Sequence, residues 1–237
     1  MAEAMLEVHD LYVGYYKDLH ILQGVSVTAQ KAKITTILGA NGVGKSTLLK
    51  AIYGFLKPTS GEVIFNGQNI VETPTHERIN LGISYIPQQP GIFPWMTVEE
   101  NLELGAWTFR HDKARLKRKL EENYERFPIL KDRRKSQAGQ LSGGMQRMVE
   151  VGRTLMTDPK LILVDEPTAG LAKLLSEEVY QMLTELRDNE GLTIILVDQE
   201  IRQALKIADY VYVLELGRNR FEGPVEEFTD LKKAFWA

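Results

Sequence analysis

Over residues 6–65, most apolar and polar positions follow the alternation and the short apolar runs that are typical of strands. Alternation and short apolar runs predict strands at residues 6–8, 25–27, 34–38 and 62–65. Residues 48–52 interrupt them with helical spacing, and Gly54 is the expected C-cap of that helix. The last of these strands enters a hairpin turn at Asn66-Gly67.

Helical spacing replaces the strand pattern from Thr97 onward. Along the next helix one face is apolar, and it carries Leu116, Leu120, Tyr124 and Phe127. We interpret residues 89–160 as a mainly helical subdomain inserted into the strand-rich chain.

Strands and helices alternate after residue 160. The pattern predicts a buried strand at residues 161–164, a helix over 176–190 that starts at Ser176 and ends at Gly191, and a strand at 193–197. Such alternation predicts a parallel sheet that binds a ligand at the carboxyl ends of its strands.

A phosphate-binding loop follows the strand at residues 34–38. It fits the P-loop pattern with Gly39, Ala40, Asn41, Gly42, Val43, Gly44, Lys45, Ser46 and Thr47. Glycines let backbone N–H groups curl around a polyphosphate, and the following helix offers its positive N-terminus. We expect Lys45 to contact the β- and γ-phosphates of ATP, and Ser46 to bind Mg²⁺.

Two acids end the strand at residues 161–164. A carboxylate at this edge of the sheet can hold Mg²⁺, the role expected of Asp165. Glu166 is then the candidate general base for the attacking water.

Composition excludes several other functions. The 237 residues carry a net charge of −3 and no cysteine, so the chain has no basic footprint for nucleic acid and no disulfide or thiolate metal site. Its apolar runs are too short to cross a bilayer, and its N-terminus does not resemble a secretory signal. Any membrane role must therefore come from a partner.

Leu141-Ser-Gly-Gly-Met-Gln146 resembles the signature motif of ABC ATPases. The resemblance implies a single α/β domain over residues 1–237: a P-loop NTPase core with an antiparallel β subdomain and the helical subdomain at about 89–160. It also implies that Ser142, Gly143 and Gly144 open a second anion-binding helix, which completes the ATP site of a partner ATPase.

Other ABC positions can be matched individually. Tyr16, or alternatively Tyr15, fits the aromatic residue that stacks on adenine. Gln88, rather than Gln89, fits the glutamine that contacts Mg²⁺ and links the two subdomains. Residues 93–105 resemble the segment that faces a permease.

The chain departs from the family pattern at two functional positions. Gln199 stands where a switch histidine is expected; it can donate a hydrogen bond to the γ-phosphate but has no titratable proton. Ala172 stands where the D-loop usually has aspartate. We therefore expect slower hydrolysis from this chain alone than from a typical family member.

These departures resemble the LivF-type ATPase of bacterial branched-chain amino-acid importers, as does the C-terminus at residues 233–237. Gln88, Met145 and Lys173 differ from that type, so the solute stays open. The alternatives are an importer of urea or amides, a lipid or lipopolysaccharide exporter and, more distantly, a non-transport ABC protein.

The resemblance also implies partners and a location. It implies a second ABC ATPase, forming a heterodimer or alternatively a homodimer, together with membrane permease subunits and, indirectly, a periplasmic or extracellular solute-binding protein. No nucleic-acid partner is expected. The chain would then lie at the cytoplasmic face of the inner membrane as a peripheral protein.

Overall fold

The computed structural model describes residues 3–16 and 19–228, so the C-terminal residues 233–237 lie outside the described part. The strands run, in chain order, over β1 (Ala4–Tyr16), β2 (Leu19–Gln30), β3 (Ile34–Leu38), β4 (Ser60–Phe65), β5 (Gln68–Asn69), β6 (Ile83–Ile86), β7 (Leu161–Asp165), β8 (Thr193–Val197), β9 (Tyr210–Glu215) and β10 (Arg218–Pro224).

The helices run over α1 (Lys45–Tyr53), α2 (Thr75–Leu81), α3 (Val98–Gly105), α4 (Lys113–Arg126), α5 (Pro128–Asp132), α6 (Gly143–Leu155), α7 (Lys173–Glu190) and α8 (Ile201–Ile207), with 3₁₀ turns η1 (Trp107–Phe109) and η2 (Ala138–Gln140). Within the described residues, no helix is both long and apolar enough to span a membrane.

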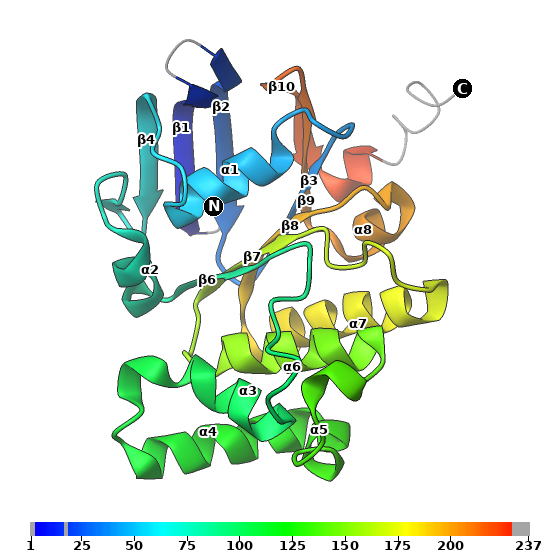
Figure 1. Ribbon diagram of the computed structural model, residues 1–237. Coiled ribbons are helices and arrows are strands. Elements are labelled where there is room, and N and C mark those ends of the chain that lie inside the picture. Colours follow the sequence, from blue (N-terminus) through cyan, green and yellow to red (C-terminus); the bar gives the residue numbers. More distant parts are fainter. Residues whose placement is uncertain (1–2, 17–18, 229–237) are drawn as a thin grey trace.

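A mostly parallel sheet forms the centre of the fold, in the order β10-β9-β3-β8-β7-β6 (Figure 1). β3, β7 and β8 are buried along their whole length, as their continuous apolar runs predict. Their parallel pairing brings the carboxyl ends of β3 and β7 to the same edge of the sheet. The predicted parallel sheet is therefore confirmed.

A second, antiparallel sheet has the order β2-β1-β4-β5. Side chains from both sheets and from α1 share one apolar cluster, which includes Leu48 and Ile52 of α1 and Val63 of β4. Gly54 caps α1 in the left-handed conformation, as its position predicts. The P-loop helix is thus held between the two sheets.

Residues 92–160, here called the helical segment, follow the loop at residues 87–91 and contain α3 to α6 between β6 and β7 (Figure 1). Thr97 starts α3 with a complete capping box to Glu100. Tyr124 and Phe127, at the end of α4, are buried in the main apolar cluster together with Val149 of α6. The amphipathic face predicted for this helix therefore packs inward.

The predicted start of a helix at Ser176 is wrong. α7 begins at Lys173, three positions before Ser176, and Ala172 is its N-cap without a side-chain cap. Ser176 is buried inside the helix, where its hydroxyl donates to the carbonyl of Ala172 at 3.4 Å, so it has a partner without capping. Glu177 and Glu178 consequently miss the first turn.

The inner face of α6 is not purely apolar. Val149 and Gly152 are buried, and Arg147 and Glu150 are buried beside them. A charged pair can enter the interior because its members pair with each other and with backbone groups nearby, although Nε of Arg147 is buried without a hydrogen-bond partner among the described residues.

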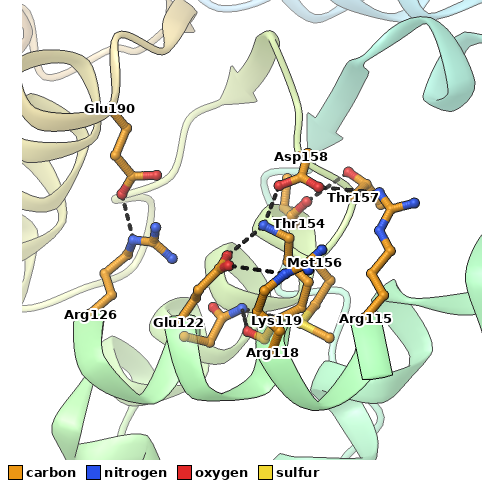
Figure 2. Close-up of polar contacts among 11 residues, drawn as sticks. Arg115, Arg118, Lys119, Glu122, Arg126, Thr154, Met156, Thr157, Asp158 and Glu190 are labelled. Carbon is orange, nitrogen blue, oxygen red and sulfur yellow. Dashed lines mark hydrogen bonds and ion pairs between the residues drawn. The ribbon is translucent and has the colours of Figure 1, made fainter. Parts of the chain in front are cut away.

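Ion pairs at the surface attach α4 to neighbouring parts of the chain (Figure 2). Arg115 and Lys119 both pair with Asp158, which lies in the loop before β7. Arg126 pairs with Glu190 at the end of α7.

Candidate functional site

A cavity of about 400 Å³ opens where the P-loop meets the end of β7. Its lining consists of Tyr15, Ile21, Asn41, Gly42, Gly44, Lys45, Ser46, Thr47, Gln88, Glu166 and Gln199. The fold therefore brings together candidate residues from five distant parts of the sequence.

The P-loop needs glycine for steric reasons. A Cβ on Gly39 would lie 2.5 Å from the carbonyl oxygen of Leu214, closer than atoms can approach. Gly44, the residue before α1, has φ of +109°, which side chains strongly disfavour. The loop consequently turns directly into α1, whose N-terminus faces the cavity.

Lys45 is buried, with 4% of its side chain exposed. Its ammonium group donates to the carbonyl oxygens of Gly39 and Ala40 at 2.9 and 3.0 Å, and lies 3.8 Å from Oε1 of Glu166. A buried ammonium group bonded to two neutral carbonyls can exchange them for phosphate oxygens, which carry charge.

Asp165 is held at both oxygens. The Ser46 hydroxyl donates to Oδ1 at 2.8 Å, and the Tyr85 hydroxyl donates to Oδ2 at 2.9 Å. Ser46 and Asp165 thus meet as predicted, whereas the contact of Tyr85 was not foreseen. The available signal was a tyrosine in the short strand Ile83-Ser-Tyr-Ile86, three residues before Gln88.

Two amide groups converge on Glu166. Nε2 of Gln88 donates to Oε2 of Glu166 at 2.7 Å, and Nε2 of Gln199 donates to the same oxygen at 3.1 Å. Glu166 itself has φ of +42°, a strained conformation for a glutamate and one found mainly at functional sites. Burial raises the pKa of Glu166, and Lys45 partly opposes that rise. A raised pKa is what a carboxylate needs to accept a proton near neutral pH.

The donors at this site suit magnesium. A hydroxyl at Ser46, a carboxylate at Asp165 and an amide oxygen at Gln88 are all hard ligands. Among the described residues there is no group of three or more His, Cys, Asp or Glu side chains that could enclose a metal. A site with so few protein ligands fits Mg²⁺, which keeps several water ligands and is also bound by the phosphates of a substrate.

The helical segment positions Gln88. Arg147 of α6 donates to the carbonyls of Pro87 and Gln88 at 2.9 and 2.8 Å, and Glu150 accepts from the backbone N–H of Gly91 at 2.7 Å. The loop over residues 87–91 is thus bound to α6 along its length. Sequence reasoning missed this role because a charged pair on a helix usually faces solvent.

The two candidate tyrosines, and likewise the two candidate glutamines, lie in different positions relative to the cavity. Tyr15 lines the cavity, whereas Tyr16 lies outside its lining with 74% of its surface exposed. Gln88 reaches Glu166, while Gln89 lies outside the lining. The geometry favours Tyr15 over Tyr16 and Gln88 over Gln89.

Ser142 lies apart from this cavity. It is exposed and caps α6 by accepting from the backbone N–H of Met145 at 3.3 Å. Gly144 is buried against Leu175 of α7, and a Cβ there would lie 2.9 Å from that side chain. Ser142 and Gly143 thus form an outward-facing helix tip that does not reach the P-loop of the same chain.

Comparisons with known proteins agree with this geometry. A family model described as ABC transporter matches residues 22–169. The chain is 41% identical over 229 residues to the probable branched-chain amino acid transport ATP-binding protein LivF of Archaeoglobus fulgidus, covering 97% of this chain and 96% of that protein. It is 42% identical over 204 residues to the high-affinity branched-chain amino acid transport ATP-binding protein BraG of Pseudomonas aeruginosa, covering 86% of each.

A solved structure has the same fold over nearly the whole chain. It is the ADP conformation of an ATP-binding cassette of an ABC transporter, with a TM-score of 0.87 at 32% identity, covering 99% of this chain and 96% of the other.

Proposed function

This chain belongs to the ABC transporter family of ATPases, and from that membership we propose that it powers uptake of branched-chain amino acids, or of a related small polar solute, through a membrane permease. In this family ATP hydrolysis is coupled to transport. The observation that carries the proposal is the convergence of Lys45, Ser46, Glu166 and two glutamines on one cavity.

The P-loop residues supply the phosphate contacts in the proposed mechanism. Backbone N–H groups from Gly39 to Thr47 surround the phosphates, and Lys45 gives up its two carbonyl partners to bind the β- and γ-phosphates. Tyr15 is the residue that stacks on adenine, since it lines the cavity and Tyr16 does not.

Ser46, Asp165 and Gln88 would hold Mg²⁺, which would supply positive charge against the phosphate oxygens when bound. Glu166 then accepts a proton from the attacking water. Gln199 donates an amide hydrogen to the γ-phosphate in the position of the usual histidine. The amides of both glutamines donate to Oε2 of Glu166 and so hold its carboxylate in the cavity.

The second half of each site comes from a partner ATPase. Family members work as dimers bound to permeases. The outward-facing tip at Ser142 and Gly143, with the buried Gly144 directly behind it, would contact the nucleotide of that partner. We propose a heterodimer with a sibling ATPase of the same importer; a homodimer is the alternative.

A groove next to the site suits a permease. A cavity of about 450 Å³ is lined by Tyr53 and Tyr85 from the core and by Phe93, Trp107 and Arg153 from the helical segment. Phe93 and Trp107 have 50% and 62% of their surfaces exposed. Docking there would hold this chain peripherally at the cytoplasmic face of the membrane, with a solute-binding protein acting from the other side.

Solute uptake tests the proposal directly. Deleting the gene from the source organism should abolish uptake of labelled leucine, isoleucine and valine, and the parent gene should restore it. Lys45→Ala should fail to restore uptake, because losing the charged donor weakens nucleotide binding by roughly 10- to 100-fold. Lys50→Ala, which removes a lysine further along α1, is the matched control and should restore uptake.

Other results would redirect the proposal. Undiminished uptake in the deletion strain would contradict the amino-acid assignment. Co-purification with a lipid or lipopolysaccharide export permease would favour an exporter, and stimulation of ATPase activity by DNA or ribosomes would favour a non-transport protein.

A further inference from the structure

The hydroxyls of Tyr85 and Ser46 each donate a hydrogen bond to a different oxygen of the Asp165 carboxylate. Asp165 is buried, with 3% of its surface exposed, and each of its oxygens accepts one hydroxyl hydrogen at 2.8 or 2.9 Å. Among the described residues no other side chain donates to this carboxylate. The rotation of the carboxylate is therefore set by two bonds, one from the P-loop and one from the edge strand β6.

We propose that Tyr85 is a positioning residue for the metal, holding the Asp165 carboxylate in the orientation that binds Mg²⁺ together with Ser46. The inference rests on the proposed function, in which Ser46 and Asp165 serve the metal. A hydroxyl can bind a cation through a lone pair while donating its hydrogen, so Ser46 can do both. Groups that orient a ligating carboxylate set metal affinity almost as strongly as the ligand itself.

The ring of Tyr85 is itself held in place. It stacks on Tyr53 of α1, with centroids 5.6 Å apart and planes 26° apart, and Phe55 contacts it edge-on at 5.6 Å. These contacts leave little freedom to the hydroxyl at the end of the ring. Tyr85 can therefore direct Asp165 instead of merely following it.

The hydroxyl also remains a donor. The Tyr85 hydroxyl donates its hydrogen to Oδ2 of Asp165 at 2.9 Å. The phenol has one hydrogen to donate, and an ionised carboxylate can only accept it.

Metal affinity tests this role in the full-length chain. Mn²⁺ would replace Mg²⁺ in titrations of the chain saturated with ADP, followed by the loss of the free-ion EPR signal. Tyr85→Phe keeps the ring and removes the hydroxyl, and it should weaken Mn²⁺ binding roughly tenfold. Its affinity for ADP in EDTA should stay within about twofold of the parent, since the P-loop contacts are unchanged.

Tyr53→Phe is the matched control. Tyr53 belongs to the same aromatic cluster and lines the same groove, but within the described residues its hydroxyl has no hydrogen-bond partner. Its Mn²⁺ affinity should equal that of the parent. Tyr85→Met, another variant without the hydroxyl, should show the same loss of Mn²⁺ affinity if the Phe variant does not fold.

Three results would overturn the inference. Mn²⁺ affinity within about twofold of the parent in Tyr85→Phe would remove the positioning role, and an equal loss in Tyr53→Phe would assign the effect to ring packing. A parent chain that binds no Mn²⁺ with ADP would overturn the metal assignment and this inference together. A failure of leucine uptake alone would contradict only the solute, and the titration would still decide the role of Tyr85.

Discussion

Helices α6 and α4 both fasten the helical segment to the rest of the chain through charged side chains, but in opposite environments. On α6, Arg147 and Glu150 have 2% and 1% of their side chains exposed, and both bind the loop at residues 87–91. On α4, Arg126 pairs with Glu190, and those side chains are 25% and 33% exposed (Figure 2).

The buried and the exposed ion pairs differ in how firmly they fix the segments that they join. Charges removed from water cost much free energy unless every partner is in place, so the pair on α6 tolerates one arrangement of the loop that carries Gln88. Charges that stay in contact with water are screened by salt and contribute little. We infer that α6 holds the loop of the site in one position, whereas the Arg126–Glu190 contact of α4 can open at low cost.

Breaking the buried pair should have the largest effect. Glu150→Ala leaves the guanidinium of Arg147 buried without its carboxylate and the N–H of Gly91 without an acceptor. We expect a loss of about 3–5 kcal/mol in the free energy of unfolding, measured by urea denaturation of the nucleotide-free chain.

A double variant controls for the cost of leaving one charge alone. Arg147→Met combined with Glu150→Leu replaces both charges by apolar groups of similar volume, and it should be more stable than Glu150→Ala. It should nevertheless hydrolyse MgATP more slowly than the parent, because Gln88 loses its anchor. A loss below about 1 kcal/mol in Glu150→Ala would contradict the contrast between the helices.

The sequence was most informative where function depends on local pattern. The P-loop, the acids after β7 and the cap at Ser142 are each defined within a few residues, and the structure has them in the expected elements. The order of strands and helices likewise predicted the parallel sheet. These features follow from backbone preferences that neighbouring residues set together.

Contacts between distant segments were not predictable in the same way. β1 pairs with β2 through several register shifts, so simple alternation cannot decide whether Tyr15 or Tyr16 faces the cavity. The burial of Arg147 and Glu150 depends on a loop 59 or more residues away. Tyr85 meets Asp165 across 80 residues for the same reason.

Substitutions at the exposed N-terminus of α6 should have an intermediate effect on stability. Ser142→Ala removes the cap on the N–H of Met145 and should lower the free energy of unfolding by about 1 kcal/mol. Ser142→Gly should lower it by only a few tenths of a kcal/mol. Thermal unfolding of the separate chain measures this. If Ser142 also contacts the nucleotide of a partner, both variants should lose ATPase activity in the dimer although only the Ala variant loses stability.

Glu166 provides a smaller, pH-dependent test, because it is a buried carboxylate without a guanidinium partner. Its raised pKa means that the folded chain holds the proton more tightly than the unfolded chain does. The folded state is therefore favoured below the unfolded pKa, and it loses that advantage as pH rises through the raised value.

Glu166→Gln should remove this dependence. The unfolding temperatures of variant and parent should agree at pH 4 and diverge toward pH 7, with the variant the more stable by less than the effect of Ser142→Ala. Hydrolysis by the variant should fall by roughly 10²- to 10⁴-fold, which separates the catalytic effect from the stability effect. A parent more stable than the variant at pH 7 would show that Lys45 outweighs burial at this carboxylate.

The pair Arg126–Glu190 should give the smallest effect. A double-mutant cycle with Arg126→Gln and Glu190→Gln isolates its coupling, expected at about 0.2–1 kcal/mol in low salt. In 1 M NaCl the coupling should nearly vanish, because charges are then screened over roughly 3 Å. The pair Lys119–Asp158 is the comparison within the same helix, and its lysine side chain is only 11% exposed. Its coupling should therefore be larger and less sensitive to salt. A salt-independent coupling of about 2 kcal/mol or more at Arg126–Glu190 would mean that α4 is fixed as firmly as α6, and the helical segment would then have no attachment that opens easily.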